Sequence, residues 1–279
     1  AQVLPLAPRD YHSLRISPNG THIAFDIRDG DNSDIWIYDI AHKTLTPLTS
    51  DEHSHNPAWT ADGKRIVFAS LDKLFSQPAD GSTQRQPLME LKDAKPASCS
   101  PDGKELLVRF DGSGLGSDIW VLSLENARDS QLVPFIERDN NQRNAVWSPD
   151  GLLVAYCSDE LGSWEVYMEP YPGPGPKIRV STDGGSQPVW SHNGKELYYR
   201  KDGKVVAVTV ETEPEFRIGG SRQLFEGNYA GCRVCQSYDV MPDGRFLMIR
   251  DPQESTPLGI NVVLNWFEEL KRVVPPRKG

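Results

Sequence analysis

The chain has 279 residues, of which 38% are hydrophobic and 25% charged, so it can bury a substantial core without a metal or a disulfide to keep it folded. Its formal net charge of −9 argues against a nucleic-acid partner and against a broad footprint on anionic membranes, because both attract clustered positive charge. No apolar run approaches the ~18 residues of a transmembrane helix, so we expect no membrane insertion by this segment.

The chain begins with a short apolar segment, AQVLPLAPRD. It lacks the basic region and the long apolar region of a signal peptide. Two alternatives stay open: a leader was removed, or the sequence is a domain cut from a longer chain. Within this segment, Gln2–Leu6 is similar to the outer strands expected further along, including Leu45–Leu48.

One four-residue turn theme recurs six times, and its final glycines lie 40 to 50 residues apart. In such a turn Pro fixes φ at the first corner, Asp or Asn bonds to the local backbone, and Gly takes the positive-φ position. The theme therefore indicates a β-hairpin at each occurrence. The six copies are Ser17–Gly20, Thr60–Gly63, Ser100–Gly103, Ser148–Gly151, Ser191–Gly194 and Met241–Gly244.

Each turn lies between short apolar stretches, as in Pro57–Trp59 before the second turn and Arg65–Phe68 after it. A further β-rich run such as Asp34–Tyr38 and a weaker one such as Leu45–Leu48 complete the repeat. Four strands in each period of ~40–50 residues are typical of a propeller, and helical periodicity is nearly absent. We predict an all-β protein, a six-bladed β-propeller of four-stranded antiparallel blades.

The last repeat is one strand short. After its turn come Arg245–Ile249 and Ile260–Leu264, and then a short helix is expected at 267–274. We predict that residues 2–6 supply the missing strand, so that the ring is closed by the N-terminal strand and two exposed sheet edges disappear. Residues 1–279 are then one propeller domain, and we expect a monomer.

Three blocks carry a more specific resemblance: Tyr167–Gly175, Ser181–Trp190 and Val262–Lys271. With the repeated Trp-Ser-Pro-Asp-Gly theme, they resemble TolB-like propellers, including those that follow serine/threonine kinase or winged-helix regions in some bacteria. The resemblance covers essentially the whole chain. It implies an extracytoplasmic or periplasmic sensing or protein-interaction domain.

The start of each inner strand is expected to lie at the mouth of the central channel. The residue five before each turn, and the one after it, are nearly all polar, and several are cationic in an otherwise acidic chain. They suggest a funnel for a protein, a peptide or a small anionic ligand. The alternative is a set of ordinary solvated loops. The candidate ligand-binding residues are His12, His55, Asn56, Lys95, Arg143, Asn144, Gln187 and Gln236.

Metal sites are weakly supported. His53 and His55, with His12, offer no third ligand at a diagnostic spacing, and the acidic run Asp26–Asp34 lacks the terminal glutamate of a calcium loop. Cys232 and Cys235 form a single CxxC, for which a local disulfide and two free thiols both stay open. We therefore predict no metal and no cofactor.

Catalysis also lacks a visible residue set. The sequence has no Gly-x-Ser-x-Gly elbow and no glycine-rich nucleotide loop. The tryptophans that recur at one repeat position, Trp59, Trp147 and Trp190, are expected between blades. We predict a non-catalytic binding module with no catalytic residues. A metal-dependent lyase or hydrolase with its site in the channel mouth is the alternative.

Overall fold

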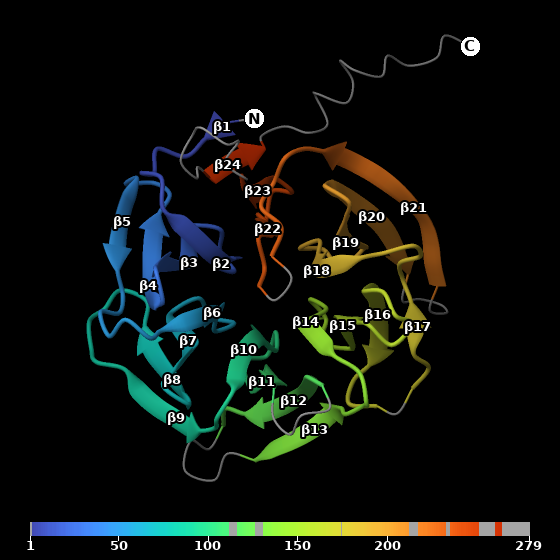
Figure 1. Cartoon of the computed structure of the whole chain (residues 1–279), viewed down its shortest axis with the longest axis horizontal. Coiled ribbons are helices and arrows are strands. Elements are labelled where there is room, and N and C mark those ends of the chain that lie inside the picture. The colour runs from blue at the N-terminus through green and yellow to red at the C-terminus, as the bar shows by residue number, and fades with distance from the viewer. Residues whose placement is uncertain are drawn as a thin grey trace.

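The computed structural model describes residues 2–111, 116–125, 131–173, 175–211, 217–232, 235–250 and 260–263. Their strands form six four-stranded sheets in which all pairs are antiparallel. Figure 1 shows these sheets arranged around a central channel, each with its first strand innermost. The predicted propeller of four-stranded antiparallel blades is confirmed. The expected helix at 267–274 lies outside the described residues.

The first three blades follow one another in chain order. Blade 1 contains β2 (Asp10–Ile16), β3 (His22–Asp29), β4 (Asn32–Asp39) and β5 (Thr44–Pro47). Blade 2 contains β6 (His55–Trp59), β7 (Arg65–Ser70), β8 (Lys73–Pro78) and β9 (Gln86–Glu90). Blade 3 contains β10 (Ala94–Cys99), β11 (Glu105–Phe110), β12 (Asp118–Ser123) and β13 (Leu132–Ile136).

The next two blades repeat this order, and the last one uses both ends of the chain. Blade 4 contains β14 (Gln142–Trp147), β15 (Leu153–Ser158), β16 (Glu165–Pro170) and β17 (Ile178–Arg179). Blade 5 contains β18 (Ser186–Trp190), β19 (Glu196–Lys201), β20 (Lys204–Glu211) and β21 (Arg217–Glu226). Blade 6 contains β22 (Tyr238–Val240), β23 (Phe246–Ile249), β24 (Ile260–Val263) and β1 (Gln2–Val3).

Blade 6 joins the two ends of the chain. Gln2 pairs with Val262 and Val3 with Asn261, so β1 forms the outer strand beside β24 (Figure 1). Leu4 and Leu6 continue from β1 onto the hydrophobic cluster between blades 6 and 1. The N-terminal segment therefore contributes both backbone pairing and apolar packing to this blade.

The hydrophobic core is divided among the interfaces between blades. Six clusters of buried side chains each combine residues of two neighbouring blades. Trp59, Trp147 and Trp190 belong to the clusters at the 1–2, 3–4 and 4–5 interfaces, as expected for these tryptophans. The strands β7, β11 and β15, each second in its blade, are buried along most of their length and each carries an unbroken apolar run, such as Leu106–Val108 in β11.

The repeated turns also contact one another around the ring. The turn glycine of one blade lies against the turn proline of the preceding blade at four interfaces. These glycine and proline pairs are Gly20 with Pro242, Gly63 with Pro18, Gly151 with Pro101 and Gly194 with Pro149. The repeated motif thus supplies both the local hairpin turn and a contact between blades.

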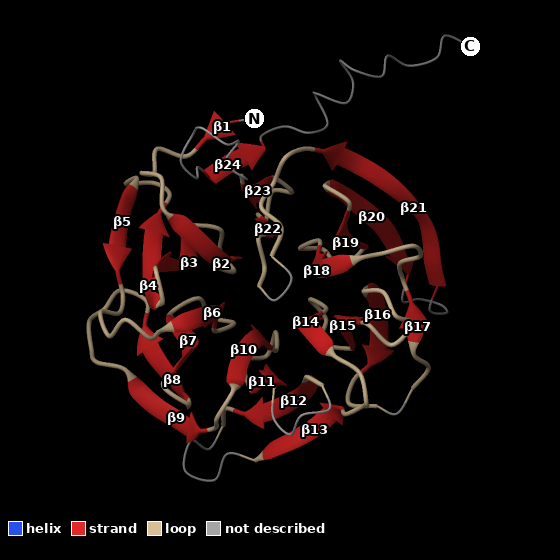
Figure 2. Cartoon of the chain, in the orientation of Figure 1, coloured by secondary structure: helices blue, strands red, loops and turns tan. Residues whose placement is uncertain are grey.

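The described residues form strands and loops only (Figure 2). Within them, there is no apolar helix of the length needed to cross a bilayer.

Candidate functional site

A repeated irregularity marks the start of the inner strands. The register between the first two strands of a blade shifts at the same place in blades 1 to 5. At that place four non-glycine residues have positive φ, between 42° and 54°: Ser13, Asn56, Asn144 and Gln187. Bulges re-aim side chains, and non-glycine residues in this region of φ are uncommon. The start of the inner strand is therefore irregular in the same way in several blades, and the bulge changes the direction in which its side chains point.

Several of these re-aimed side chains meet at the channel. Asn56 Nδ2 donates to Ser13 Oγ over 3.3 Å, and Asn144 Nδ2 donates to the Cys235 carbonyl over 3.2 Å. A small axial cavity collects four of the predicted residues: Asn56, Lys95, Asn144 and Gln236. The other four, His12, His55, Arg143 and Gln187, do not line this cavity.

The axial cavity is flanked by more cations than the sequence suggested. Lys95 on β10 pairs across the hairpin with Arg109 on β11, which also lines the cavity. Both cations bind the same carboxylate oxygen, Asp111 Oδ2, and Arg109 Nη2 does so at 2.9 Å. Burial by itself would raise the pKa of Asp111, but the hydrogen bond from Lys95 and the charge of Arg109 hold it below its ordinary value.

Arg143 adds a third positive charge near this pair. Burial lowers the pKa of Arg109; Asp111 opposes that shift, and the charge of Arg143 reinforces it. The Arg143 guanidinium carbon lies 5.0 Å from the centre of the Trp164 ring. Within the described residues its Nε atom is buried without a hydrogen-bond partner. The sequence had identified Lys95 and Arg143 but missed Arg109, whose position follows from the hairpin register.

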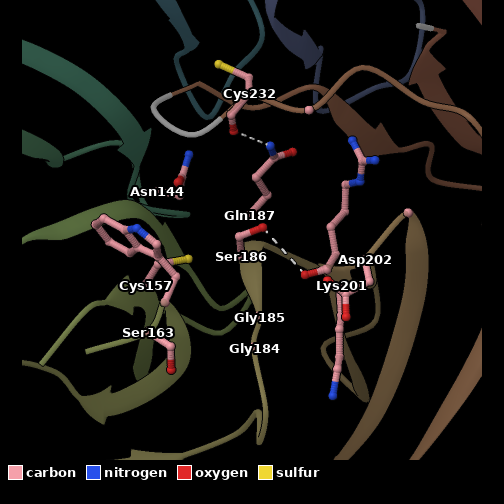
Figure 3. A pocket seen from close by; sticks show the side chains of 14 residues that line it. Asn144, Cys157, Ser163, Gly184, Gly185, Ser186, Gln187, Lys201, Asp202 and Cys232 are labelled. Atoms are coloured by element: carbon pink, nitrogen blue, oxygen red, sulfur yellow. Dashed lines mark hydrogen bonds between the residues drawn. The ribbon is translucent and has the colours of Figure 1, made fainter. Parts of the chain in front are cut away.

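A larger cavity of about 480 Å³ opens beside the same mouth, between blades 4 and 5. Its lining includes Asn144, Ser186 and Gln187, together with Arg200 and Cys232 (Figure 3). A volume of this size is within the range of small-ligand sites. The two predicted residues Asn144 and Gln187 thus face a cavity with room for a ligand.

The side chain of Gln187 is engaged by the protein itself. Its Nε2 donates to the Cys232 carbonyl over 2.6 Å, as the dashed line in Figure 3 shows. Its Oε1 accepts from the backbone N and the Oγ of Ser237. Gln236 is also buried, and its Nε2 donates to the Gln187 carbonyl over 3.3 Å. Gln187 is therefore part of the wall of the larger cavity and Gln236 part of the wall of the axial cavity, and ligand contact by either stays a prediction.

His55 lies half-buried next to a fully buried carboxylate. Its Nδ1 is 2.9 Å from Asn56 Oδ1. Burial lowers the pKa of His55, while the Asn56 hydrogen bond and the charge of Asp26 oppose the shift. Asp26 is 0% exposed, and neither of its oxygens has a hydrogen-bond partner within the described residues. Burial therefore favours the neutral imidazole of His55, in a setting that also contains the charges of Asp26 and Lys95.

The histidines that were weighed as a metal site, His12, His53 and His55, do not form one group among the described residues. Only one group there brings three potential ligand atoms within 4.8 Å of one another: His12, Cys232 and Cys235. His53 is exposed and His55 does not belong to this group. In the acidic run Asp26–Asp34, the Oδ1 atom of Asp34 accepts hydrogen bonds from Thr49 Oγ1 and from the backbone N of Asp51. These bonds give the Asp34 carboxylate a structural role in its own loop.

The cysteines fall into two kinds. Cys232 and Cys235 form a disulfide with a Cα–Cα distance of 5.3 Å, one of the two alternatives that the sequence left open. Cys99 is half-buried and Cys157 is buried, and burial raises the pKa of each thiol to about 12. High thiol pKa values disfavour the thiolate, so these two cysteines are packing residues.

The opposite mouth of the channel has a different lining. A cavity of about 450 Å³ there is bounded by the repeated turns and by Trp59, Trp147 and Trp190. Arg15 and Asp239 also reach it. The two mouths therefore differ: cations and amides surround one, and indoles and prolines surround the other.

Comparison with known proteins places the fold. No protein-family model matches the chain, and no curated protein matches it. The solved structure of TolB from Acinetobacter baumannii superposes with a TM-score of 0.68 at 21% identity, covering 88% of this chain and 61% of TolB. This chain thus spans about three-fifths of that TolB.

Two further structures agree with this fold. A protein described as TolB from Agrobacterium tumefaciens gives a TM-score of 0.67 at 13% identity, covering 92% of this chain and 91% of its own. Oligogalacturonate lyase from Vibrio parahaemolyticus gives 0.59 at 10% identity, covering 90% and 73%. At these identities the likeness concerns the fold, and the chain has a TolB-like propeller fold.

Proposed function

We propose that this protein is a non-catalytic, six-bladed binding propeller that holds an anionic group of a protein, peptide or small ligand at the inner-strand mouth of its channel. One observation carries the proposal. Lys95 and Arg109 share the single carboxylate of Asp111, and Arg143 lies close to them. Lys95 and Arg109 thus gather at one carboxylate and Arg143 adds positive charge beside Arg109, in a chain whose net charge is −9.

The chemistry of these cations suits a carboxylate. A guanidinium presents a planar fork of donors that can bind a carboxylate with two hydrogen bonds. The side chains of Lys95 and Asp111 are 29% and 28% exposed, so an incoming anion can compete with Asp111 for Lys95. Asn144 lines both the axial cavity and the larger one and supplies a neutral amide between them.

The enzyme alternative has less support. Of the histidines weighed as metal ligands, only His12 belongs to a group of three potential ligands among the described residues, and its partners there are two cysteines rather than His53 or His55. The similarity to an oligogalacturonate lyase concerns the fold. It nevertheless makes an acidic sugar a useful probe beside an acidic peptide.

The cellular setting is part of the proposal. The sequence resemblance to TolB-like propellers, including those behind kinase or winged-helix regions, supports an extracytoplasmic or periplasmic sensing role for a monomer. The disulfide between Cys232 and Cys235 is consistent with an oxidising compartment.

Charge reversal at the cationic mouth tests the binding site. We expect Lys95→Glu and Arg143→Glu each to weaken binding of a triglutamate peptide or of digalacturonate at least tenfold, about 1.4 kcal/mol, by calorimetry. Lys73→Glu is the matched control, because Lys73 pairs with Glu90 on the outer part of blade 2. It makes the same change in net charge and should alter the affinity less than twofold.

Two outcomes of these binding measurements would contradict the proposed anion site. If both probes bind the wild type and neither charge reversal weakens them, the anion does not sit at this mouth. If neither probe binds the wild-type protein, the proposed carboxylate specificity is wrong. Circular dichroism and the melting temperature of each variant would show that the propeller is folded.

A further inference from the structure

We propose that His12, Cys232 and Cys235 form a redox-gated site for a thiophilic divalent metal such as Zn²⁺, which binds once the disulfide is reduced. The potential ligand atoms of these three residues lie within 4.8 Å of one another. The cysteines come from the loop before β22, and His12 comes from β2 of the next blade around the ring. The site therefore joins the last blade to the first.

The separation of the ligand atoms fits one metal ion. His12 Nδ1 lies 3.8 Å from Cys235 Sγ. With Zn–N near 2.0 Å and Zn–S near 2.3 Å, two ligands of a tetrahedral zinc lie roughly 3.6 Å apart. Two cysteines separated by two residues are also a common zinc-chelating pair. The two sulfur atoms have to separate for both to bind one ion, which reduction of their bond allows.

The imidazole of His12 is already oriented for this role. Its Nε2 is 3.0 Å from Asp10 Oδ1 on the same strand. When Nε2 carries the proton and donates to Asp10, the lone pair of Nδ1 faces the Cys235 sulfur. A carboxylate that holds the far nitrogen of a histidine is the usual outer partner of a metal-binding imidazole. Asp10 is therefore the positioning residue of the site.

The disulfide and the metal-bound site exclude each other, because both use the sulfur atoms of Cys232 and Cys235. A dithiol reductant gives two electrons and two protons to the disulfide, which becomes two thiols while the reductant becomes a disulfide. Binding of M²⁺ then releases two protons, leaving two thiolates and a neutral imidazole around the ion with no net charge. Three protein ligands leave one position of a tetrahedral ion open.

Cobalt provides a direct measurement, because Co²⁺ bound to thiolates absorbs strongly in the near ultraviolet. The whole protein is reduced with a dithiol, freed of reductant and metal under inert gas, and titrated with Co²⁺ alone. We expect one equivalent to bind with thiolate absorption, to be displaced by Zn²⁺, and to fail to bind to the oxidised protein. Absence of thiolate absorption in the reduced wild type would overturn the proposal.

Variants assign the ligands. Cys232→Ser and Cys235→Ser should each abolish the thiolate absorption or weaken Co²⁺ binding at least a hundredfold. His12→Gln and Asp10→Asn should weaken it about tenfold or more. Cys99→Ala and His42→Gln are controls remote from the site and should leave it unchanged. Undiminished absorption and affinity in Cys235→Ser would refute the site, and an unchanged affinity in His12→Gln would remove His12 from it. Melting temperatures confirm that each variant is folded.

Discussion

Burial determines the protonation of His55 at the channel mouth. Loss of solvent disfavours the imidazolium and lowers the pKa of His55, although Asn56 and Asp26 oppose this shift. His42 is the opposite case. The hydrogen bond and the charge of Asp39 raise the pKa of His42 on the surface of blade 1. The same residue type therefore responds to pH with opposite signs at the two positions.

This difference gives a prediction for stability against pH. The unfolded chain protonates His55 near its ordinary pKa of about 6.5, whereas the folded chain does so only at lower pH. Stability from neutral His55 is thus present above pH 6.5 and is lost as the pH falls below it. We expect His55→Gln to reduce the loss of urea stability between pH 7 and pH 5.

His42→Gln serves as the control of opposite sign. Its raised pKa contributes stability that is present below pH 6.5 and is lost as the pH rises through the folded pKa. Removing His42 should therefore leave the acid loss intact or increase it slightly. Equal pH profiles for wild type and His55→Gln would show that His55 does not respond to acid as described.

At the scale of the elements, the turn motif couples one blade to the next. Gly20 has φ of +71°, and a Cβ added there would lie 2.8 Å from Pro242 Cδ in blade 6. Gly30 has φ of +62° in the β3–β4 turn, and nothing lies within 4 Å of an added Cβ. The two positions share the backbone requirement and differ in the contact between blades.

This pair separates backbone strain from blade packing. Gly30→Ala should cost about 1 kcal/mol, because alanine disfavours positive φ. Gly20→Ala should cost roughly 2–3 kcal/mol, since the methyl group also collides with Pro242. Urea denaturation of both variants measures the difference. If both variants lose the same free energy of unfolding, the close contact between Gly20 and Pro242 does not restrict the residue at position 20.

At the scale of the whole molecule, the ring depends on residues from both ends of the chain. β1 pairs with β24, Leu4 and Leu6 pack on the cluster between blades 6 and 1, and the Tyr11 hydroxyl donates to the Ala7 carbonyl over 2.6 Å. Without this segment, β24 has an open edge and the last interface loses apolar contacts. Such an edge also favours pairing with other chains.

Deletion of residues 1–7 tests this closure. We expect a loss of at least about 2 kcal/mol from the lost apolar burial and pairing, which is a fall of roughly 3–4 °C or more in melting temperature for a chain of this length. Leu4→Ala alone should give a smaller fall, since it keeps the strand pairing. An unchanged melting temperature after the deletion would refute the structural role of the N-terminal strand.

Much of the architecture is local and therefore readable from the sequence. The six turns between β-rich segments specify hairpins through residue chemistry alone, and their spacing indicates four strands in each blade. The position of Lys95, Asn144 and Asn56 at inner-strand starts follows from that spacing, and the structure brings these three to one axial cavity. Repetition makes such placement predictable, because each blade repeats the same geometry.

Tertiary structure decided which partners these residues meet. The strand register brings Lys95 and Arg109 to the same carboxylate of Asp111. Ring closure brings His12 close to Cys235, which is 223 positions away in the sequence. The engagement of Gln187 by Cys232 and Ser237 has the same origin. A hydrogen bond or ion pair forms only when two atoms from segments far apart in the chain are held at the right distance to within a few tenths of an ångström. A turn pattern contains no information about those distances.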